Sequence, residues 1–422
     1  GPFERLPEEA VPVSDPNMHT NKGDLRATAL QQNPFWLLGA STRDDRQRLI
    51  ELTDEKSLDQ DAESFQKARA DLINPRTRLN AEMAWLPGVA PSRARYLATK
   101  AADNPNSIGQ EIGLPPLAHT NLMAAALEGT ENQVSSRTMS QLIEQIASLI
   151  ERCKVDDIVR DINEDRTIAG FPLVKTAQVE TEFADRTRSY RNMIKAALNR
   201  LPTVVLVEAM TITVDRLTKG GTSQAPTLID ELVDSYEVES QHFLQEEATN
   251  VRTLIKAIQN VAGSGASAVN PLIDKLGHVV QNWDQVAQPI QLSAKARGME
   301  HHLSHELAYA IRSLSIDLCN THSLLPESQR LTNLVQAVFA ELPEVKERVE
   351  QDSVALEQLV RAQKKTEAEL AEWARNITYQ VEIGLIFKHT LSISPSGLAW
   401  KNHCYPLANV TRVRWGAIRQ SI

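Results

Sequence analysis

The chain has 422 residues, which is enough for roughly two to four domains with cores of their own. Hydrophobic residues make up 42% and charged residues 23%, as in an ordinary globular protein. The formal net charge of -9, without any block of lysine and arginine, argues against nucleic acid as a main partner, because phosphate binding requires a basic surface.

The N-terminal part divides into a lead-in and a helical unit. Residues 1–32 carry Pro, Asp, Asn and Glu without periodicity, which predicts a flexible lead-in. Residues 33–90 are predicted to contain two amphipathic helices pressed against each other. An apolar segment at 35–39 introduces the first helix. The Asn-Pro step at 74–75 ends the second, because proline cannot continue a helix and restricts the residue before it.

Phe65, Ala68 and Leu72 lie at i, i+3 and i+7, so they share one face of the second helix. With the Leu-Gly step before the first helix and the Asn-Pro step after the second, this layout resembles a J domain. J domains are the modules by which co-chaperones engage DnaK-type ATPases. The resemblance assigns a J-like structural core to eight residues: Leu37, Leu38, Gly39, Leu49, Phe65, Ala68, Leu72 and Pro75.

Two features of a working J domain are missing. The His-Pro-Asp tripeptide that lies between its helices is absent, and the connecting loop is reduced to about residues 57–61. Residues 43–56 carry four basic and five acidic side chains, so this surface is balanced rather than basic. The resemblance therefore implies a DnaK-type partner held without stimulation of its ATPase. It assigns partner contacts to Phe35, Trp36, Arg43, Arg46, Arg69, Arg76 and Arg78.

Residues 91–378 show helical periodicity almost throughout. Segments rich in glycine and serine, at 219–223 and 262–267, predict turns or linkers between helices. We therefore predict one helical domain over residues 91–220 and a second over residues 221–382.

Apolar residues mark the faces of these helices. One face in the first domain comprises Leu142, Ile143, Ile146, Leu149 and Ile150, and one in the second comprises Leu228, Leu232 and Tyr236. Near the end of the second domain, apolar residues recur at multiples of seven: Val349, Leu356, Leu370 and Ile377, with Leu359 and Trp373 beside them. This repeat, interrupted by Gln363 and Thr366, predicts a long coiled-coil-like helix.

The last part of the chain, residues 383–422, is predicted to form a small antiparallel β segment. Strand candidates are residues 391–394, 398–405 and 411–418, with a turn at 395–397. The pattern resembles the opening strands of a pleckstrin-homology-like barrel, which would be incomplete in this chain. A small three-stranded cap on the helical body is the alternative.

No metal or cofactor site is predicted. His301 and His305, one helical turn apart, are the best metal candidates, but spacing places no further ligand beside them. The three cysteines lie far apart without a Cys-x-x-Cys pair, which argues against disulfides and zinc and is typical of the reducing cytoplasm. No apolar run approaches the roughly 20 residues of a membrane span.

The sequence as a whole predicts a mainly α protein with a J-like N-terminal unit, a long helical body and a C-terminal β segment. The favoured function is that of a non-enzymatic, cytoplasmic, co-chaperone-like adaptor or scaffold without a cofactor. A second hypothesis is a scaffold that self-assembles through the helical body and has no chaperone link. A third is a metal-dependent hydrolase that uses His301 and His305.

Overall fold

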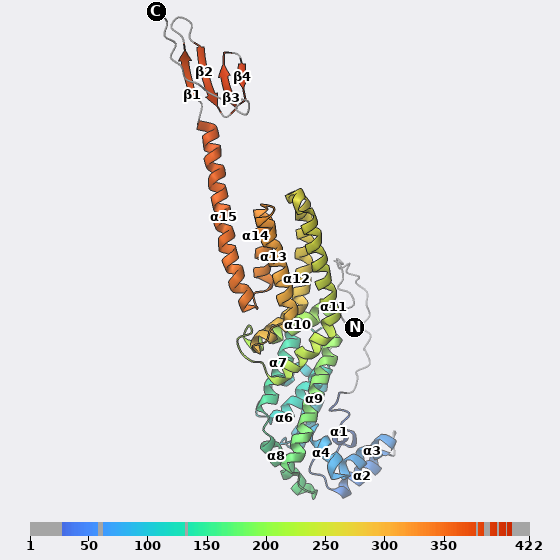
Figure 1. Ribbon diagram of the computed structural model, residues 1–422. Helices are drawn as coiled ribbons and strands as arrows, with labels where there is room; N and C mark the ends of the chain where they lie inside the picture. Colours follow the sequence, from blue (N-terminus) through green and yellow to red (C-terminus); the bar gives the residue numbers. More distant parts are fainter. Residues whose placement is uncertain are drawn as a thin grey trace, which may run out of the picture.

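The computed structural model describes residues 28–57, 62–130, 134–376, 379–383, 389–394, 396–401 and 403–406. These residues form an elongated, mainly helical molecule (Figure 1). A small helical unit lies at one end, a helical body follows, and a long helix projects from the body and carries a four-stranded antiparallel sheet. The predicted fold class, mainly α with a small antiparallel β segment, is confirmed.

The N-terminal unit contains α1 (Pro34–Leu38), α2 (Arg46–Ser57), α3 (Ala62–Ile73) and α4 (Pro75–Met83). Helices α2 and α3 pack on each other, as predicted, and α1 lies against α3. The Asn-Pro step has a second role beyond ending α3. The side chain of Asn74 accepts a hydrogen bond from the Arg76 amide, and Pro75 takes the first position of α4. Apart from Ser57, the predicted loop at 57–61 lies outside the described residues.

The lower body is built from α5 (Pro91–Asp103), a 3-10 turn η1 (Pro105–Gln110), α6 (Pro116–Glu128), α7 (Ser136–Arg152), α8 (Val155–Ala169), α9 (Thr176–Asn199) and α10 (Thr203–Thr218). Four residues of the predicted face of α7 are buried: Leu142, Ile143, Ile146 and Leu149. The fifth, Ile150, is partly exposed and packs against the core. Within the described ranges, the helices lack the combination of length and apolar character needed to cross a membrane.

The upper body contains α11 (Thr227–Val261), a 3-10 turn η2 (Ala262–Ser264), α12 (Ala266–Ala296), α13 (His302–Asn320) and α14 (Leu325–Val338). The predicted face of α11, Leu228, Leu232 and Tyr236, is buried. Both segments rich in glycine and serine connect helices, as predicted. The domain boundary predicted at 220/221 falls between α10 and α11, but α10 packs against α12 across it, so the hydrophobic core is continuous there.

The long helix α15 (Pro343–Asn376) has two parts. Its first part packs on α14 and α13 through Val345, Val349 and Leu356, and an ion pair joins Arg312 to Asp352 with an N–O distance of 2.6 Å. Residues 357–372 lie beyond the body, and nearly all of their side chains are exposed (Figure 1). The long helix is therefore confirmed, whereas its packing as a coiled coil stays a prediction.

The sheet consists of β1 (Tyr379–Ile383), β2 (His389–Ser394), β3 (Gly397–Trp400) and β4 (His403–Tyr405), paired in that order. The register aligns Ile393, Leu398 and Tyr405 across three strands. On the same face Leu391, Trp400 and His403 form the next row. One face of the sheet is therefore apolar and aromatic, and Tyr405 is 51% exposed on it.

Two details of the predicted β segment were wrong. Residues 379–382, assigned to the helical domain, belong to a strand, because the period-two alternation of Tyr379, Val381 and Ile383 matches that of β2. The strand predicted at 398–405 is two strands, separated by a turn at Lys401, which has a left-handed φ of 54°. The third predicted strand, at 411–418, lies outside the described residues.

Three buried charged side chains join the N-terminal unit to the lower body. Arg78 and Glu82 come from α4 and Arg166 comes from α8, and their side chains are 0%, 3% and 2% exposed. Arg78 Nε donates to Glu82 Oε1 at 2.8 Å, and Arg166 Nε donates to Glu82 Oε2 at 2.9 Å. One carboxylate thus holds two guanidinium groups from different parts of the chain.

The remaining nitrogens of both guanidinium groups also donate hydrogen bonds. Arg78 donates to the carbonyls of Leu72 and Thr42, and its guanidinium lies 3.9 Å from the centre of the Phe171 ring. Arg166 donates to the carbonyls of Pro172 and Pro75. Burial raises the pKa of Glu82 and lowers the pKa of Arg78, while the ion pair between Arg78 and Glu82 favours the charged form of each of these two groups. The cluster is therefore fully hydrogen-bonded, which is the condition under which a buried ion pair is tolerated.

Replacing the shared carboxylate tests this account. We expect Glu82→Gln to lower the free energy of unfolding by about 3–5 kcal/mol, because two guanidinium groups would remain buried without a counterion. Urea denaturation followed by circular dichroism measures the loss. The matched control is Glu51→Gln on α2, where an exposed pair with Arg48 is broken and the free energy of unfolding should change little. Equal stability of the two variants would contradict the role given to the cluster.

Candidate functional site

A groove lies between the loop that follows α1 and the start of α5. It has a volume of about 440 Å³. It is lined by Gly39, Ala40, Ser41, Thr42, Asp44, Trp85, Pro91, Ser92, Arg95, Tyr96 and Thr99. The groove therefore borders the N-terminal unit, in which the sequence predicts partner contacts.

The loop at 39–44 is fixed by a set of local and distant contacts. Gly39 ends α1 with a left-handed φ of 68°, a conformation that glycine adopts without strain. Thr42 Oγ1 donates to Asp165 Oδ2 at 2.6 Å, and Arg43 Nε donates to Asp165 Oδ1 at 2.8 Å. Asp165 lies on α8 beside Arg166. Helix α8 therefore contacts both the buried charged residues of α4 and this wall of the groove.

The other wall carries the side chains best suited to protein contact. The Arg95 guanidinium lies 5.1 Å from the centre of the Trp36 ring, close enough for a cation–π contact, and Tyr96 is 63% exposed. Tryptophan, tyrosine and arginine are the residue types that dominate the binding energy of protein interfaces. The three side chains together therefore offer a candidate contact surface.

Two of the seven predicted partner residues lie in the interior. Phe35 and Arg78 are both 0% exposed. Phe35 contacts Trp85, with ring centres 6.3 Å apart, and the Arg78 guanidinium lies 5.4 Å from the centre of the Phe35 ring. A partner cannot reach either side chain in this structure, so both have structural rather than binding roles.

The other five predicted partner residues are at least partly accessible, but they do not form one surface. Trp36 is half-buried beneath Arg95, at the groove. Arg43 pairs with Asp165, and Arg46 lies 5.5 Å from the centre of the Phe171 ring. Arg69 is half-buried on α3 and Arg76 is exposed at the start of α4.

The J-like core residues occupy structural positions. Leu38, Leu49, Ala68 and Leu72 are buried, and Leu37 and Phe65 pack against the core while partly exposed. Gly39 caps α1 and Pro75 starts α4.

Sequence analysis missed Arg95 and Tyr96. The available signal was the pattern of α5, in which Ala94, Leu97 and Ala98 mark the buried face while Tyr96 lies off it. An exposed tyrosine next to an arginine is the pair of residue types that binding hot spots favour.

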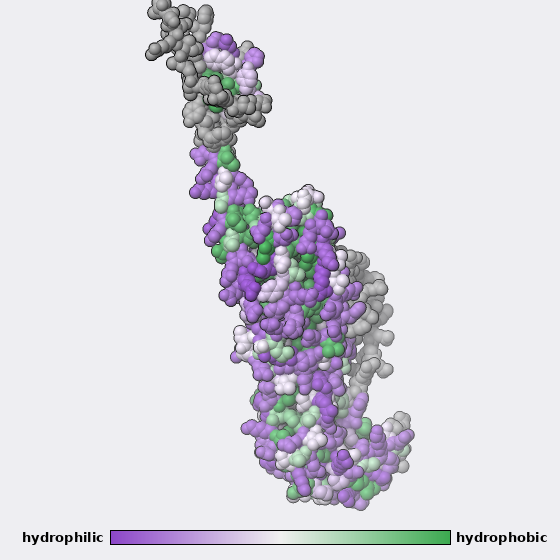
Figure 2. All heavy atoms as spheres, in the orientation of Figure 1, coloured by the Kyte–Doolittle hydropathy of each residue, from purple (hydrophilic) through white to green (hydrophobic). Residues whose placement is uncertain are grey.

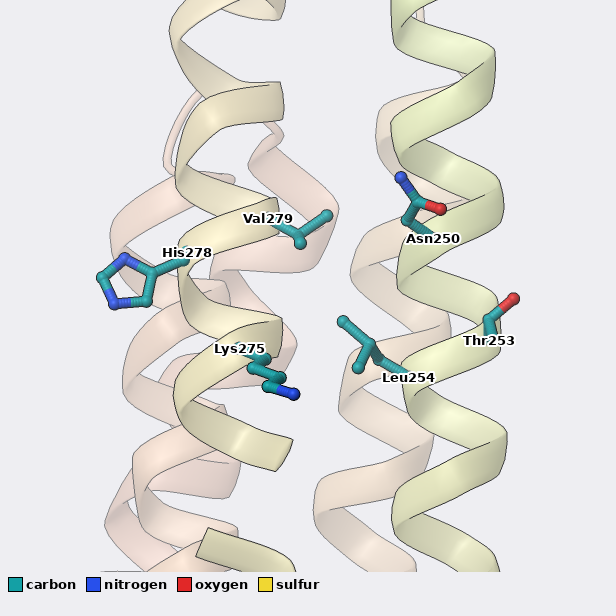
Figure 3. Close-up of a pocket in the computed structure, with 6 residues that line it drawn as sticks. All are labelled: Asn250, Thr253, Leu254, Lys275, His278 and Val279. Atoms are coloured by element: carbon teal, nitrogen blue, oxygen red, sulfur yellow. The ribbon is translucent and has the colours of Figure 1, made fainter. Parts of the chain in front are cut away.

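A second pocket, of about 370 Å³, lies between α11 and α12 (Figure 3). Leu254 and Val279 point into the space between the two helices. His278 and Lys275, its two titratable side chains, point in different directions, so they do not converge on a common ligand. This arrangement offers no concerted chemistry.

The predicted metal candidates are engaged in protein contacts. His301 Nδ1 lies 2.5 Å from Ser304 Oγ, and its ring stacks on Trp283 with centres 6.3 Å apart. His305 lies against Tyr309. Across the residues that the structure describes, no three His, Cys, Asp or Glu side chains are grouped as metal ligands would be. The metal-dependent hydrolase therefore gains no support from this geometry.

Comparisons with known proteins add no assignment: no protein-family model, curated protein or solved structure matches the chain.

The buried His301 ring makes a testable contribution to pH dependence. Burial lowers the pKa of His301 from 6.5 to about 4, and Glu237 Oε1, at 3.8 Å from Nε2, does not offset this effect. Between these pH values His301 binds a proton in the unfolded chain but not in the folded protein. The free energy of unfolding therefore falls as pH decreases from about 6.5 to 4. We expect His301→Gln to flatten that part of the stability profile.

Urea midpoints measured at several pH values between 4 and 7.5 give this comparison. His242→Gln serves as the control, because the His242 side chain is 90% exposed on α11. If the pH profiles of the wild-type protein and His301→Gln run parallel, the buried ring does not govern stability in this range.

Proposed function

We propose that this protein is a non-enzymatic adaptor that binds a protein partner through the groove beside its N-terminal unit. The observation that carries the proposal is the placement of Tyr96 and Arg95 on one wall of a groove whose opposite wall is fixed to α8, with the Trp36 ring in contact with Arg95. A rigid groove that presents aromatic and arginine side chains loses little conformational entropy on binding.

The overall architecture supports an adaptor role. The N-terminal unit beside the groove lies at one end of the molecule, and α15 carries the sheet away from the other end (Figure 1). The sheet has an apolar face on which Tyr405 and Ile393 are exposed. Figure 2 shows that the visible surface between these ends is mainly hydrophilic. Two separated contact surfaces joined by a hydrophilic body suit a protein that connects partners.

The resemblance to a J domain suggests which partner to test first. A DnaK-type chaperone bound at this unit would not be stimulated, because the chain has no His-Pro-Asp tripeptide. The balanced charge of α2 fits the same expectation, since docking of a working J domain depends on a basic face. We therefore propose a DnaK-type chaperone, held without acceleration of ATP hydrolysis, as the partner.

Binding of the full-length protein to a purified DnaK-type chaperone tests this proposal by calorimetry. We expect saturable binding, unchanged ATPase turnover, and weakening by about 2 kcal/mol, roughly 30-fold, in Tyr96→Ala. Tyr96 is exposed, so its truncation should leave the fold intact. Ile168→Ala on α8, another exposed apolar side chain, is the matched control and should bind like the wild-type protein.

Two outcomes would count against the proposal. Binding that is the same in Tyr96→Ala and the wild-type protein would exclude the groove. Absence of chaperone binding would remove this partner. A cytosolic protein that is captured by the wild-type protein, is lost in Tyr96→Ala and binds directly when purified would then keep the adaptor role.

The exposed part of α15 favours self-assembly as a second candidate function. Leu359 and Leu370 are 49% and 60% exposed there. Charge is segregated along the same segment, with Arg361, Lys364 and Lys365 followed by Glu367, Glu369 and Glu372. Two copies of this helix placed antiparallel would bring the basic half of each near the acidic half of the other.

Light scattering over a range of concentrations tests self-assembly. We expect the average mass to rise with concentration and to fall with added salt, because exposed charge pairs are screened. The double substitution Leu359→Ser and Leu370→Ser should restore the monomer, whereas Leu173→Ser, which alters an exposed leucine elsewhere, should not. A mass that stays at 46.9 kDa at every concentration would exclude this function.

A further inference from the structure

A cavity with apolar walls lies between α10 and α12. Its volume is about 430 Å³. Val207 and Val286 are buried in its walls, and Val204 is 58% exposed. The remaining lining residues are polar or acidic: Glu208, Thr211, Asp284, Gln285 and Gln288. The cavity therefore combines apolar walls with two carboxyl groups.

Hydrogen-bond acceptors outnumber donors on the α12 side of this cavity. Among the residues that the structure describes, Asp284 Oδ1 on the cavity wall, and Glu341 Oε2 and Gln291 Oε1 outside the lining residues, are buried without a hydrogen-bond partner. Gln291 is 1% exposed, and its Nε2 donates to Ser304 Oγ at 3.1 Å. Gln288, which lines the cavity, donates to Glu341 Oε1 at 2.6 Å. The unpartnered Asp284 oxygen on the cavity wall therefore suits a ligand that brings a hydrogen-bond donor.

Asp284 also lacks a counterion. The neighbouring groups that influence its charge are Glu341, which is acidic, and Gln291, which is neutral. Burial, with a smaller contribution from Glu341, raises the pKa of Asp284 to about 8. In the unliganded protein at neutral pH, a proton therefore occupies the position that a cation could take.

We propose that this cavity binds a protonated primary amine carried on a short apolar stem. The ammonium group would donate to Asp284 and to the acceptors around it, and the stem would pack between Val207 and Val286. The amine binds in its cationic form. The Asp284 carboxyl loses its proton to solvent and becomes the carboxylate that pairs with the ammonium.

The amine has two sources with the same chemistry. It can be a free alkylamine, or it can be the side chain of a lysine in another protein, which is also a primary amine on a four-carbon stem. This site is separate from the groove at Tyr96 and does not depend on the proposed adaptor function.

Calorimetry of the full-length protein with n-pentylamine at pH 7 is the direct test. We expect saturable binding at one site with release of about one proton per amine, read from the dependence of the heat on the buffer's ionisation enthalpy. The release should vanish at about pH 9 and above, where Asp284 is already ionised. n-Pentanol, which has the stem without the charge, should bind at least about tenfold more weakly.

The site-directed arm uses Asp284→Asn. An amide imitates the protonated acid in shape and charge, so the variant should fold like the wild-type protein. We expect amine affinity to fall by about tenfold or more and proton release to disappear. Asp274→Asn, an exposed position on the same helix, is the control and should retain both. A parallel titration with Nα-acetyl-lysine amide distinguishes the sources, since the bulkier backbone must remain at the mouth of the cavity.

Each contrary result overturns the proposal. Absence of saturable pentylamine binding excludes the site. Equal binding of pentanol shows that the cavity recognises only the apolar stem. Equal binding by Asp284→Asn places the amine elsewhere, and binding without proton release shows that the amine does not displace the Asp284 proton.

Discussion

The fold of the N-terminal half depends on one carboxylate. Glu82 is buried between Arg78 and Arg166, and a charge in that position cannot be left unpaired without a large loss of stability. Separation of α4 from α8 would break the ion pair between Glu82 and Arg166 and the hydrogen bond from Arg166 to the Pro75 carbonyl. The small helical unit is therefore firmly attached to the body. The groove beside it is held in the same way, because Thr42 donates to Asp165, the neighbour of Arg166 on α8.

The sequence predicted local structure correctly where apolar residues recurred with the period of a helix. The apolar spacing of residues 142–150 identified the buried face of α7, and the helix pair at α2 and α3 followed from Phe65, Ala68 and Leu72. Arg78 shows where such reasoning fails. A basic residue is assigned to the surface by default. Glu82 is a local partner four residues further on, but Arg166 and the Phe171 ring, which help to bury the pair, come from α8 and the segment after it. Arg166 lies 84 residues from Glu82 along the chain, a distance that no local pattern encodes.

The same limit applies to the candidate sites. Trp36 was predicted to contact a partner, but Arg95 reaches it from a helix 59 residues later in the chain. Asp284 and Glu341 each have the character of an ordinary surface acid when taken alone. Their proximity arises because Gln288 on α12 contacts the connection between α14 and α15, 53 residues further along the chain. Chemistry that depends on tertiary proximity was not accessible to pattern analysis.

The length of the exposed part of α15 also determines how the sheet is placed relative to the body. Ion pairs one turn apart, between Arg361 and Glu357 and between Lys365 and Glu369, support the helix where its side chains are exposed. A continuous helix advances about 1.5 Å and turns about 100° with each residue. The number of residues in the exposed part of α15 therefore sets the distance of the sheet from the body (Figure 1). It also sets the direction in which the apolar face of the sheet points. Length changes of seven or eleven residues, close to whole turns, would preserve that direction, whereas an insertion of two would turn the face to nearly the opposite side.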